Sequence, residues 1–122
     1  MEPAAAVVDR YATVDVRLGD ARIDRGEMVR VSLAGANRDP AVFPDPDVFD
    51  PTRANLRSKL AFARGPHVCV AMELARLEAR IAVQTLATVP GLRLVAPVEP
   101  RGLVFRKPAE LRLAWDVGGQ SQ

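Results

Sequence analysis

The sequence predicts an α+β fold made of short antiparallel β-hairpins, a proline-rich loop and one long helix. Short β-branched runs separated by turn residues at Gly19-Asp20 and at 24–27 predict the hairpins. Prolines interrupt the segment 38–61, and helical spacing of apolar residues begins at Val70. A chain of 122 residues has the length of one domain, so we expect a single segment over 1–122.

The region 7–34 is expected to hold the hairpins. The runs 12–18 and 28–33 are rich in β-branched residues and roughly alternate, and Arg22-Ile23 begins a short strand between them. Strands that follow one another through tight turns predict a small antiparallel meander. Residues 32–37 can form one helical turn after it.

The segment 38–61 is expected to be an ordered loop. It contains four prolines and several aspartates, a composition that no helix or sheet interior tolerates. Phe43 and Phe49 are the expected anchors of this loop into a core, because they and the neighbouring valines Val42 and Val48 favour burial.

A long helix is expected over about 70–89. Apolar residues recur there at helical spacing between good helix formers, and Pro90-Gly91 ends the pattern. Glu73 and Arg76 lie three residues apart, so they can pair on the outer face. Two short strands, 92–95 and 111–115, are expected within a C-terminal segment 92–116, followed by a polar tail at 118–122.

Composition excludes several classes of protein. Hydrophobic content of 48% and charged content of 26% are ordinary for a globular protein, and a net charge of +2 gives no reason to expect nucleic-acid binding. One cysteine cannot form an internal disulfide, which favours a reducing compartment. The N-terminus lacks the pattern of a signal peptide, and no apolar run is long enough for a membrane helix. We therefore expect a cytoplasmic protein that does not bind membranes.

The single cysteine, Cys69, lies in the stretch FARGPHVCVAMELARLE, next to the start of the expected long helix. The first turn of a helix offers unpaired N–H groups and the positive end of the helix dipole. Arg64 and His67 add positive charge nearby, and Gly65 permits a tight turn and a close approach of the backbone to a neighbour. These features favour a thiolate at Cys69.

Four interpretations of this cysteine are open on the residues alone. A Cys–His nucleophile pair with His67 lacks a third group to orient it. A zinc site would need four ligands, and one cysteine with one histidine supplies half of them. A haem axial ligand needs one thiolate and cationic groups for the propionates. The fourth interpretation is a structural cysteine buried under the helix without any ligand.

The spacing Phe62-x-x-Gly65-x-x-x-Cys69-x-Ala71, followed by Glu73-Leu74-Ala75-Arg76-Leu77-Glu78, resembles the haem-binding signature of the cytochrome P450 family of haem-thiolate monooxygenases. Several fixed positions agree at once, and the resemblance extends over about residues 8–116. It implies a C-terminal fragment of that fold. The other stretches that resemble the family are 10–16, 23–31, 36–40 and 43–49.

The resemblance also implies a cofactor and its contacts. The cofactor is haem b (iron protoporphyrin IX), with Cys69 as the proximal iron ligand and therefore the metal-binding residue. His67 and Arg10 match residues that contact the haem propionates. Phe62 matches the aromatic residue beside the thiolate. Gly65 matches the tight loop position, and Ala71 stands where glycine is commonest.

The implied activity is NAD(P)H- and O₂-dependent hydroxylation through a ferredoxin-type electron donor. Such a donor would meet a basic proximal face, to which the resemblance assigns Arg53, Arg57, Lys59, Arg64, Arg76 and Arg80; the alternative for these residues is an ordinary solvated helix surface. The family's oxygen-activating helix and substrate-binding half have no counterpart here, so we name no catalytic residue and expect the chain alone to lack full catalytic competence. The alternative is a truncated remnant that no longer binds haem, or that pairs with another chain through an exposed apolar face.

Two residues of this chain depart from the family pattern. Ala63 stands where glycine is usual, and Val48 stands where the loop before the signature usually has an arginine.

Overall fold

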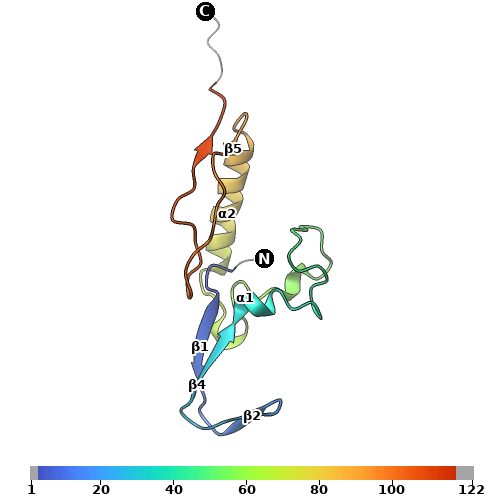
Figure 1. The fold of residues 1–122 in the computed structure, drawn as a ribbon, viewed down its shortest axis with the longest axis vertical. Coiled ribbons are helices and arrows are strands. Elements are labelled where there is room, and N and C mark those ends of the chain that lie inside the picture. Colours follow the sequence, from blue (N-terminus) through green and yellow to red (C-terminus); the bar gives the residue numbers. More distant parts are fainter. Residues whose placement is uncertain (1–2, 118–122) are drawn as a thin grey trace, which may run out of the picture. The chain divides into compact units, whose positions relative to one another are not determined.

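The structure is a computed structural model that describes residues 3–117, and it divides into two compact units (Figure 1). Of the described residues, the first unit holds 3–61 and 102–106, and the second holds 62–101 and 107–117. The sequence did not predict this division, and each unit is described by itself below. The polar tail expected at 118–122 lies outside the described residues.

Two antiparallel strand pairs form the β-structure of the first unit. Strand β1 (Val7–Tyr11) pairs with β4 (Met28–Ser32), and β2 (Val16–Leu18) pairs with β3 (Ala21–Ile23). The β2–β3 hairpin is therefore nested between two strands that pair with each other. This order differs from the expected meander, in which each strand would pair with the next.

The strand expected over 12–18 is present only as its last three residues, in β2. The chain leaves the β1–β4 ladder after Ala12, whose amide donates to the Glu27 carbonyl at 3.0 Å. Asp15 then accepts the Arg25 amide at 2.9 Å. These contacts fix a turn where the sequence pattern alone favoured an extended strand.

A cross-strand ion pair reinforces the β1–β4 ladder. Asp9 and Arg30 face each other in the register, and the Arg30 guanidinium donates to the two carboxylate oxygens at 2.7 and 2.9 Å. The hydrogen bond from Arg30 holds the pKa of Asp9 below its usual value. The short helix α1 (Leu33–Ala36) follows β4, and the Ser32 hydroxyl caps it by accepting the Gly35 amide at 3.0 Å.

Only one of the two expected aromatic anchors of the proline-rich loop is buried. Phe43 joins Ala6 and Leu33 in the small buried core of the first unit, whereas Phe49 is 90% exposed. The prediction for Phe49 is wrong, and so is the expected burial of Val42 and Val48, which are 42% and 60% exposed. Polar contacts fix the loop without burial of Phe49.

Arg53 is the residue that holds the proline-rich loop together. Its guanidinium donates to the carbonyl oxygens of Pro44, Asp45 and Val48, the last two at 2.6 and 3.0 Å. Asn55 adds a hydrogen bond from its side chain to the Val42 carbonyl. Prolines leave carbonyl groups without neighbouring N–H donors, so an arginine that donates to several of them can stabilise an irregular path. An arginine therefore does serve this loop, although position 48 is valine.

The second unit contains the long helix, α2 (Met72–Ala87), drawn yellow to orange in Figure 1. It is shorter by two residues at each end than the predicted range. The expected pair of Glu73 and Arg76 is confirmed at 2.7 Å. Strands β5 (Arg93–Leu94) and β6 (Leu113–Ala114) lie within the two ranges expected for C-terminal strands but are shorter, and they pair antiparallel, which the sequence did not predict.

The end of α2 is fixed by a close approach of two backbone segments. Gly91 adopts a φ of +62°, and a Cβ there would lie 2.0 Å from an oxygen of the Asp116 side chain. The Asp116 amide donates to the Pro90 carbonyl at 2.9 Å, and Arg93 pairs with the Asp116 carboxylate at 3.1 Å. Glycine suits this position because of its left-handed conformation, and a Cβ here would also make the Asp116 side chain move.

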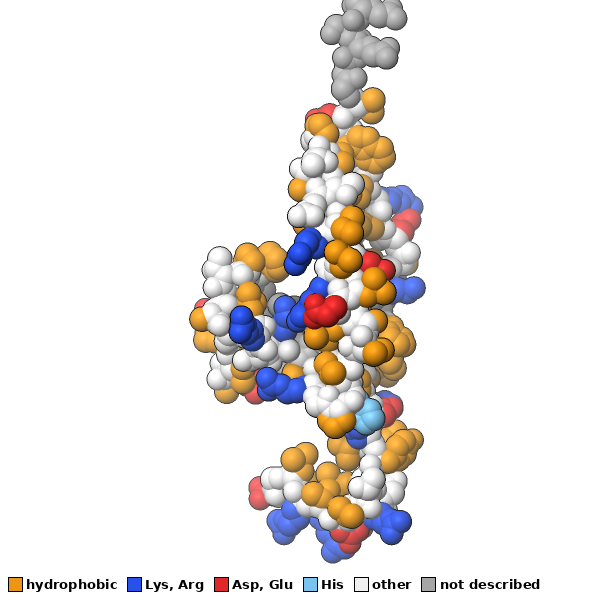
Figure 2. All heavy atoms as spheres, turned by 180° about the vertical axis from the view of Figure 1, so that it is seen from behind, with side chains coloured by type: hydrophobic (Ala, Val, Ile, Leu, Met, Phe, Trp, Pro, Cys, Tyr) orange, Lys and Arg blue, Asp and Glu red, His pale blue; other side chains and the backbone are white. Residues whose placement is uncertain are grey.

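No described residue of the second unit is buried. Leu74, Leu77 and Ile81 share one face of α2 and are 57%, 50% and 54% exposed. Figure 2 shows hydrophobic side chains, in orange, open over the face that it presents. Among residues 3–117, no helix is long and apolar enough to cross a membrane.

Candidate functional site

The loop that carries Cys69 is closed by a backbone hydrogen bond. The Cys69 amide donates to the Phe62 carbonyl at 2.9 Å. Between them lies a single 3-10 turn, η2 (Gly65–His67), in which the Val68 amide donates to the Gly65 carbonyl at 3.0 Å. We call residues 62–69 the cysteine loop.

Two residues of the cysteine loop have left-handed backbone conformations. Gly65 has a φ of +80°, and Ala63 has a φ of +59°. No heavy atom lies within 4 Å of a Cβ built on Gly65, so this glycine is needed for its conformation. The close approach to a neighbour that we expected at Gly65 is absent among the described residues. Ala63 adopts the conformation that explains why glycine suits its position.

Cys69 is a free, exposed cysteine that lies three residues before α2. The interpretation of a cysteine buried under the helix is therefore wrong for the described residues. Ala71 stands at the N-cap without a side-chain hydrogen bond, and the Met72 amide donates to the Cys69 carbonyl at 3.1 Å. The thiol is thus presented just ahead of a helix start that no side chain caps.

The structure brings five of the six predicted site residues together in one unit, because Phe62, Gly65, His67, Cys69 and Ala71 are close in sequence. His67 ends the turn η2 and is exposed. Arg10 belongs to β1 in the first unit, where its Nη1 donates to the Asp9 carbonyl at 2.8 Å. Among residues 3–117, no three His, Cys, Asp or Glu side chains form a group that could hold a metal ion.

A side-chain contact that the sequence did not predict joins α2 to the cysteine loop. The Arg76 guanidinium carbon lies 5.7 Å from the centroid of the Phe62 ring, over its face. The same guanidinium donates to Glu73 at 2.7 Å. The three-residue spacing predicts the pair along the helix, but a contact between residues 14 positions apart depends on the path of the loop.

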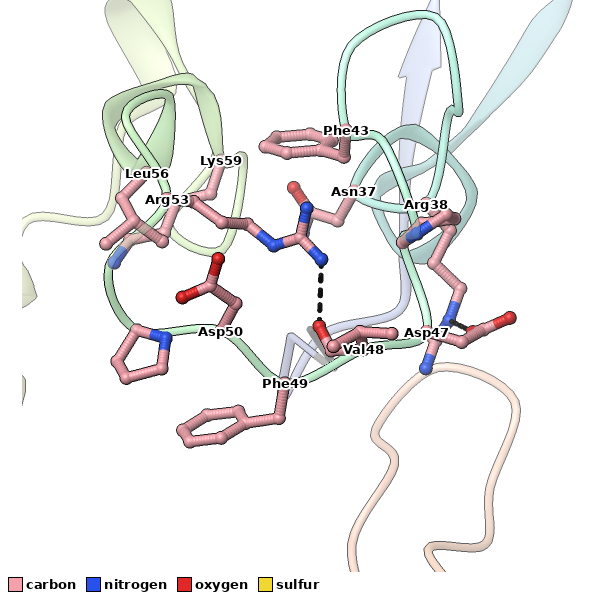
Figure 3. A pocket seen from close by; sticks show the side chains of 12 residues that line it. Asn37, Arg38, Phe43, Asp47, Val48, Phe49, Asp50, Arg53, Leu56 and Lys59 are labelled. Carbon is pink, nitrogen blue, oxygen red and sulfur yellow. Dashed lines mark hydrogen bonds and ion pairs between the residues drawn. The ribbon is translucent and has the colours of Figure 1, made fainter.

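The first unit contains a pocket of about 400 Å³ in the proline-rich loop (Figure 3). Its apolar lining includes Phe43, Phe49 and Leu56. The Arg53 side chain also lines it, and the dashed line in Figure 3 marks its bond to the Val48 carbonyl.

One buried polar group in this pocket lacks a partner. The side-chain oxygen of Asn37 accepts the Leu60 amide at 2.7 Å, while its Nδ2 has no partner among the described residues.

Comparisons with known proteins agree on one family. The family model described as "Cytochrome P450" matches residues 1–87. The chain is 44% identical over 111 residues to nocardicin C N-oxygenase of Nocardia uniformis subsp. tsuyamanensis, a match that covers 87% of this chain and 28% of that protein. It is 40% identical over 105 residues to mycocyclosin synthase of Mycobacterium tuberculosis, covering 85% of this chain and 26% of that protein.

Solved structures show the same similarity in three dimensions. The crystal structure of P450BioI in complex with an acyl carrier protein ligated to hexadec-9Z-enoic acid matches with a TM-score of 0.86 and 41% identity. The match covers 94% of this chain and 30% of that one. The chain thus spans less than a third of the length of these relatives.

Proposed function

Because this chain belongs to the cytochrome P450 family, we propose that it provides the haem-thiolate part of a monooxygenase, with Cys69 as the iron ligand. The observation that carries the proposal is the exposed Cys69 thiol, held by a closed loop directly ahead of the uncapped start of α2. Membership of the family implies a haem cofactor. When bound through a thiolate, haem supplies the chemistry that activates O₂.

The residues around Cys69 fit a haem better than they fit a metal ion alone. One soft sulfur donor suffices for an axial ligand, whereas a structural zinc ion would need four ligands. Val68 and Val70 beside the cysteine are 44% and 102% exposed, and they offer apolar surface for a large ring. N–H groups at the start of a helix can donate to a negatively charged sulfur.

Two basic residues are proposed as contacts for the haem propionates. His67 lies two residues before Cys69 and is exposed. Arg10 is exposed on β1, and its guanidinium makes one hydrogen bond to its neighbour's backbone, which leaves further donors for a carboxylate. Phe62, Gly65 and Ala71 are proposed to shape the loop around the sulfur.

A ferredoxin-type protein is the proposed electron donor. Arg64, Arg76 and Arg80 lie on the cysteine loop and α2, against Glu73 and Glu78 on the same helix. An excess of positive charge beside the cofactor would steer an acidic partner toward it.

We also propose a cytoplasmic location, on the ground that a single cysteine and a thiolate ligand suit a reducing compartment.

Hydroxylation of a substrate is proposed for this segment when it is paired with the rest of the family's fold, which would supply a distal pocket. The apolar face of Leu74, Leu77 and Ile81 on α2 favours this pairing, because side chains of this kind are normally covered. A chain that binds no haem and only pairs through this face is the second candidate function.

Titration with hemin distinguishes the two candidates. The proposed function predicts one haem per chain for the wild type and weaker, non-saturating binding for Cys69→Ala. Identical titrations of the two proteins would leave only the second candidate, and sedimentation of the haem-free chain then measures whether the apolar face pairs with a second copy of the chain.

A further inference from the structure

The Arg76 side chain, on α2, contacts the cysteine loop. Its guanidinium lies over the Phe62 ring at 5.7 Å and pairs with Glu73 at 2.7 Å. The Arg76 side chain is 49% exposed and Glu73 is 77% exposed, so both contacts face solvent. A cation–π contact at an exposed site and a helical ion pair are each weak, but they act on the same guanidinium.

Phe62 is the first residue of the cysteine loop and closes it. Its carbonyl accepts the Cys69 amide, and its ring receives Arg76, so one residue is tied both to the thiol-bearing residue and to the helix. The next residue, Ala63, has a left-handed conformation that an alanine adopts only at a cost. Because the backbone at Ala63 is strained, a contact that holds the neighbouring Phe62 side chain in place stabilises the loop in this conformation.

We infer that Arg76 is a positioning residue for the Cys69 thiol: by stacking on Phe62 it fixes the cysteine loop against α2. Glu73 restrains the guanidinium in that position. The inference rests on the proposed function for its importance to haem ligation, but the positioning itself is a property of the haem-free chain.

Amide hydrogen exchange at Cys69 tests the positioning without haem. In the full haem-free chain, Arg76→Ala is expected to speed exchange of the Cys69 amide about two- to fivefold, the range that an exposed cation–π contact gives. Phe62→Leu keeps the carbonyl but removes the ring, so it is expected to act in the same direction. The double variant should exchange no faster than the faster of the two single variants, because each removes the same contact.

Matched variants complete the test. Arg80→Ala removes an exposed arginine one turn further along α2 and is expected to leave Cys69 exchange unchanged. Arg76→Lys keeps the charge, so the exchange rate of its Cys69 amide is expected to lie between those of the wild type and Arg76→Ala. Glu73→Gln should raise that rate less than Arg76→Ala does. Additive effects of Arg76→Ala and Phe62→Leu, or an equal effect of Arg80→Ala, would overturn the inference.

A second readout connects positioning to ligation. With haem and carbon monoxide, Arg76→Ala is expected to convert part of the thiolate-type absorption band into the band of a neutral thiol, while Arg80→Ala is not. An unchanged band ratio in Arg76→Ala would overturn the role in ligation. If the exchange coupling is present but wild type and Cys69→Ala give the same haem spectrum, the loop positioning stands and the proposed function fails.

Discussion

The Cys69 amide donates to the Phe62 carbonyl at 2.9 Å, and this bond turns eight residues into a closed loop that presents a free thiol. Loop closure of this kind fixes where the sulfur is held without burying it. A metal ligand must be held in place and still be open to the metal, so this geometry suits the iron ligand that we propose Cys69 to be.

Replacement of Ala63 by glycine is expected to stabilise the protein by about 0.5 to 1 kcal/mol. Ala63 has a φ of +59°, where alanine is strained by about 1–2 kcal/mol and glycine is not. The larger entropy of glycine in the unfolded chain removes part of this gain. Urea unfolding gives the difference. The control Ala75→Gly, inside α2, should instead lose about 1 kcal/mol, and a loss in both variants contradicts the prediction.

The opposite change at Gly65 is expected to destabilise the cysteine loop. Gly65 has a φ of +80°, so Gly65→Ala should lose about 1 kcal/mol although a Cβ would meet no neighbour. Asparagine tolerates this conformation better, and Gly65→Asn should lose less. Unfolding free energies of the two variants check the order, and an alanine variant as stable as the wild type would show that the loop is not under this constraint.

Loss of the Arg53 side chain is expected to loosen the proline-rich loop. Arg53→Met keeps the length of the side chain but removes donors to the carbonyls of Asp45 and Val48, and should destabilise the protein by about 1–2 kcal/mol. Arg57→Met, at an exposed arginine four residues later, is the matched control and should change stability by less than about 0.5 kcal/mol. Equal effects of the two variants would mean that the carbonyl contacts do not hold the loop.

The ion pair between Asp9 and Arg30 makes part of the stability depend on pH. Its hydrogen bond lowers the pKa of Asp9 in the folded state, so the unfolded state binds the proton more tightly. The stability that this ion pair contributes is therefore fully present above the usual aspartate pKa of 3.8, and it is lost as the pH falls through the lower pKa of the folded state. Asp9→Asn should be less stable than the wild type at neutral pH, and the difference should shrink in acid. A difference that is constant with pH contradicts this origin.

Contacts within one element were predictable from the sequence, whereas contacts across loops were not. The Glu73–Arg76 pair follows from the three-residue spacing on a helix, and the positions of the two C-terminal strands, but not their pairing, follow from short β-branched and apolar runs. The bonds from Arg53 to backbone carbonyls depend on the path of the proline-rich loop, which no spacing rule gives. A segment in which several prolines remove N–H donors, followed by an arginine, is the signal that could have indicated them.

Burial was the least predictable property. Phe43 and Phe49 look alike in the sequence, yet one is buried and the other is 90% exposed. Burial depends on which segments of the fold pack over a side chain. The sequence around each phenylalanine does not say which segments these are. The candidate site residues could be named from the sequence, because a lone cysteine lies in a short signature, and their role in haem binding stays a prediction. The contact of Arg76 with Phe62 was not, because it depends on how the loop returns to the helix.

The absorption spectrum of the reduced, carbon-monoxide-bound protein tests the central claim most directly. The full chain is mixed with hemin, reduced and exposed to carbon monoxide, next to Cys69→Ala and next to His67→Ala as a variant that keeps the sulfur. We expect a thiolate-type band in the wild type and in His67→Ala, with less haem bound in the latter, and no such band in Cys69→Ala. The same nonspecific haem spectrum in wild type and Cys69→Ala would contradict the account.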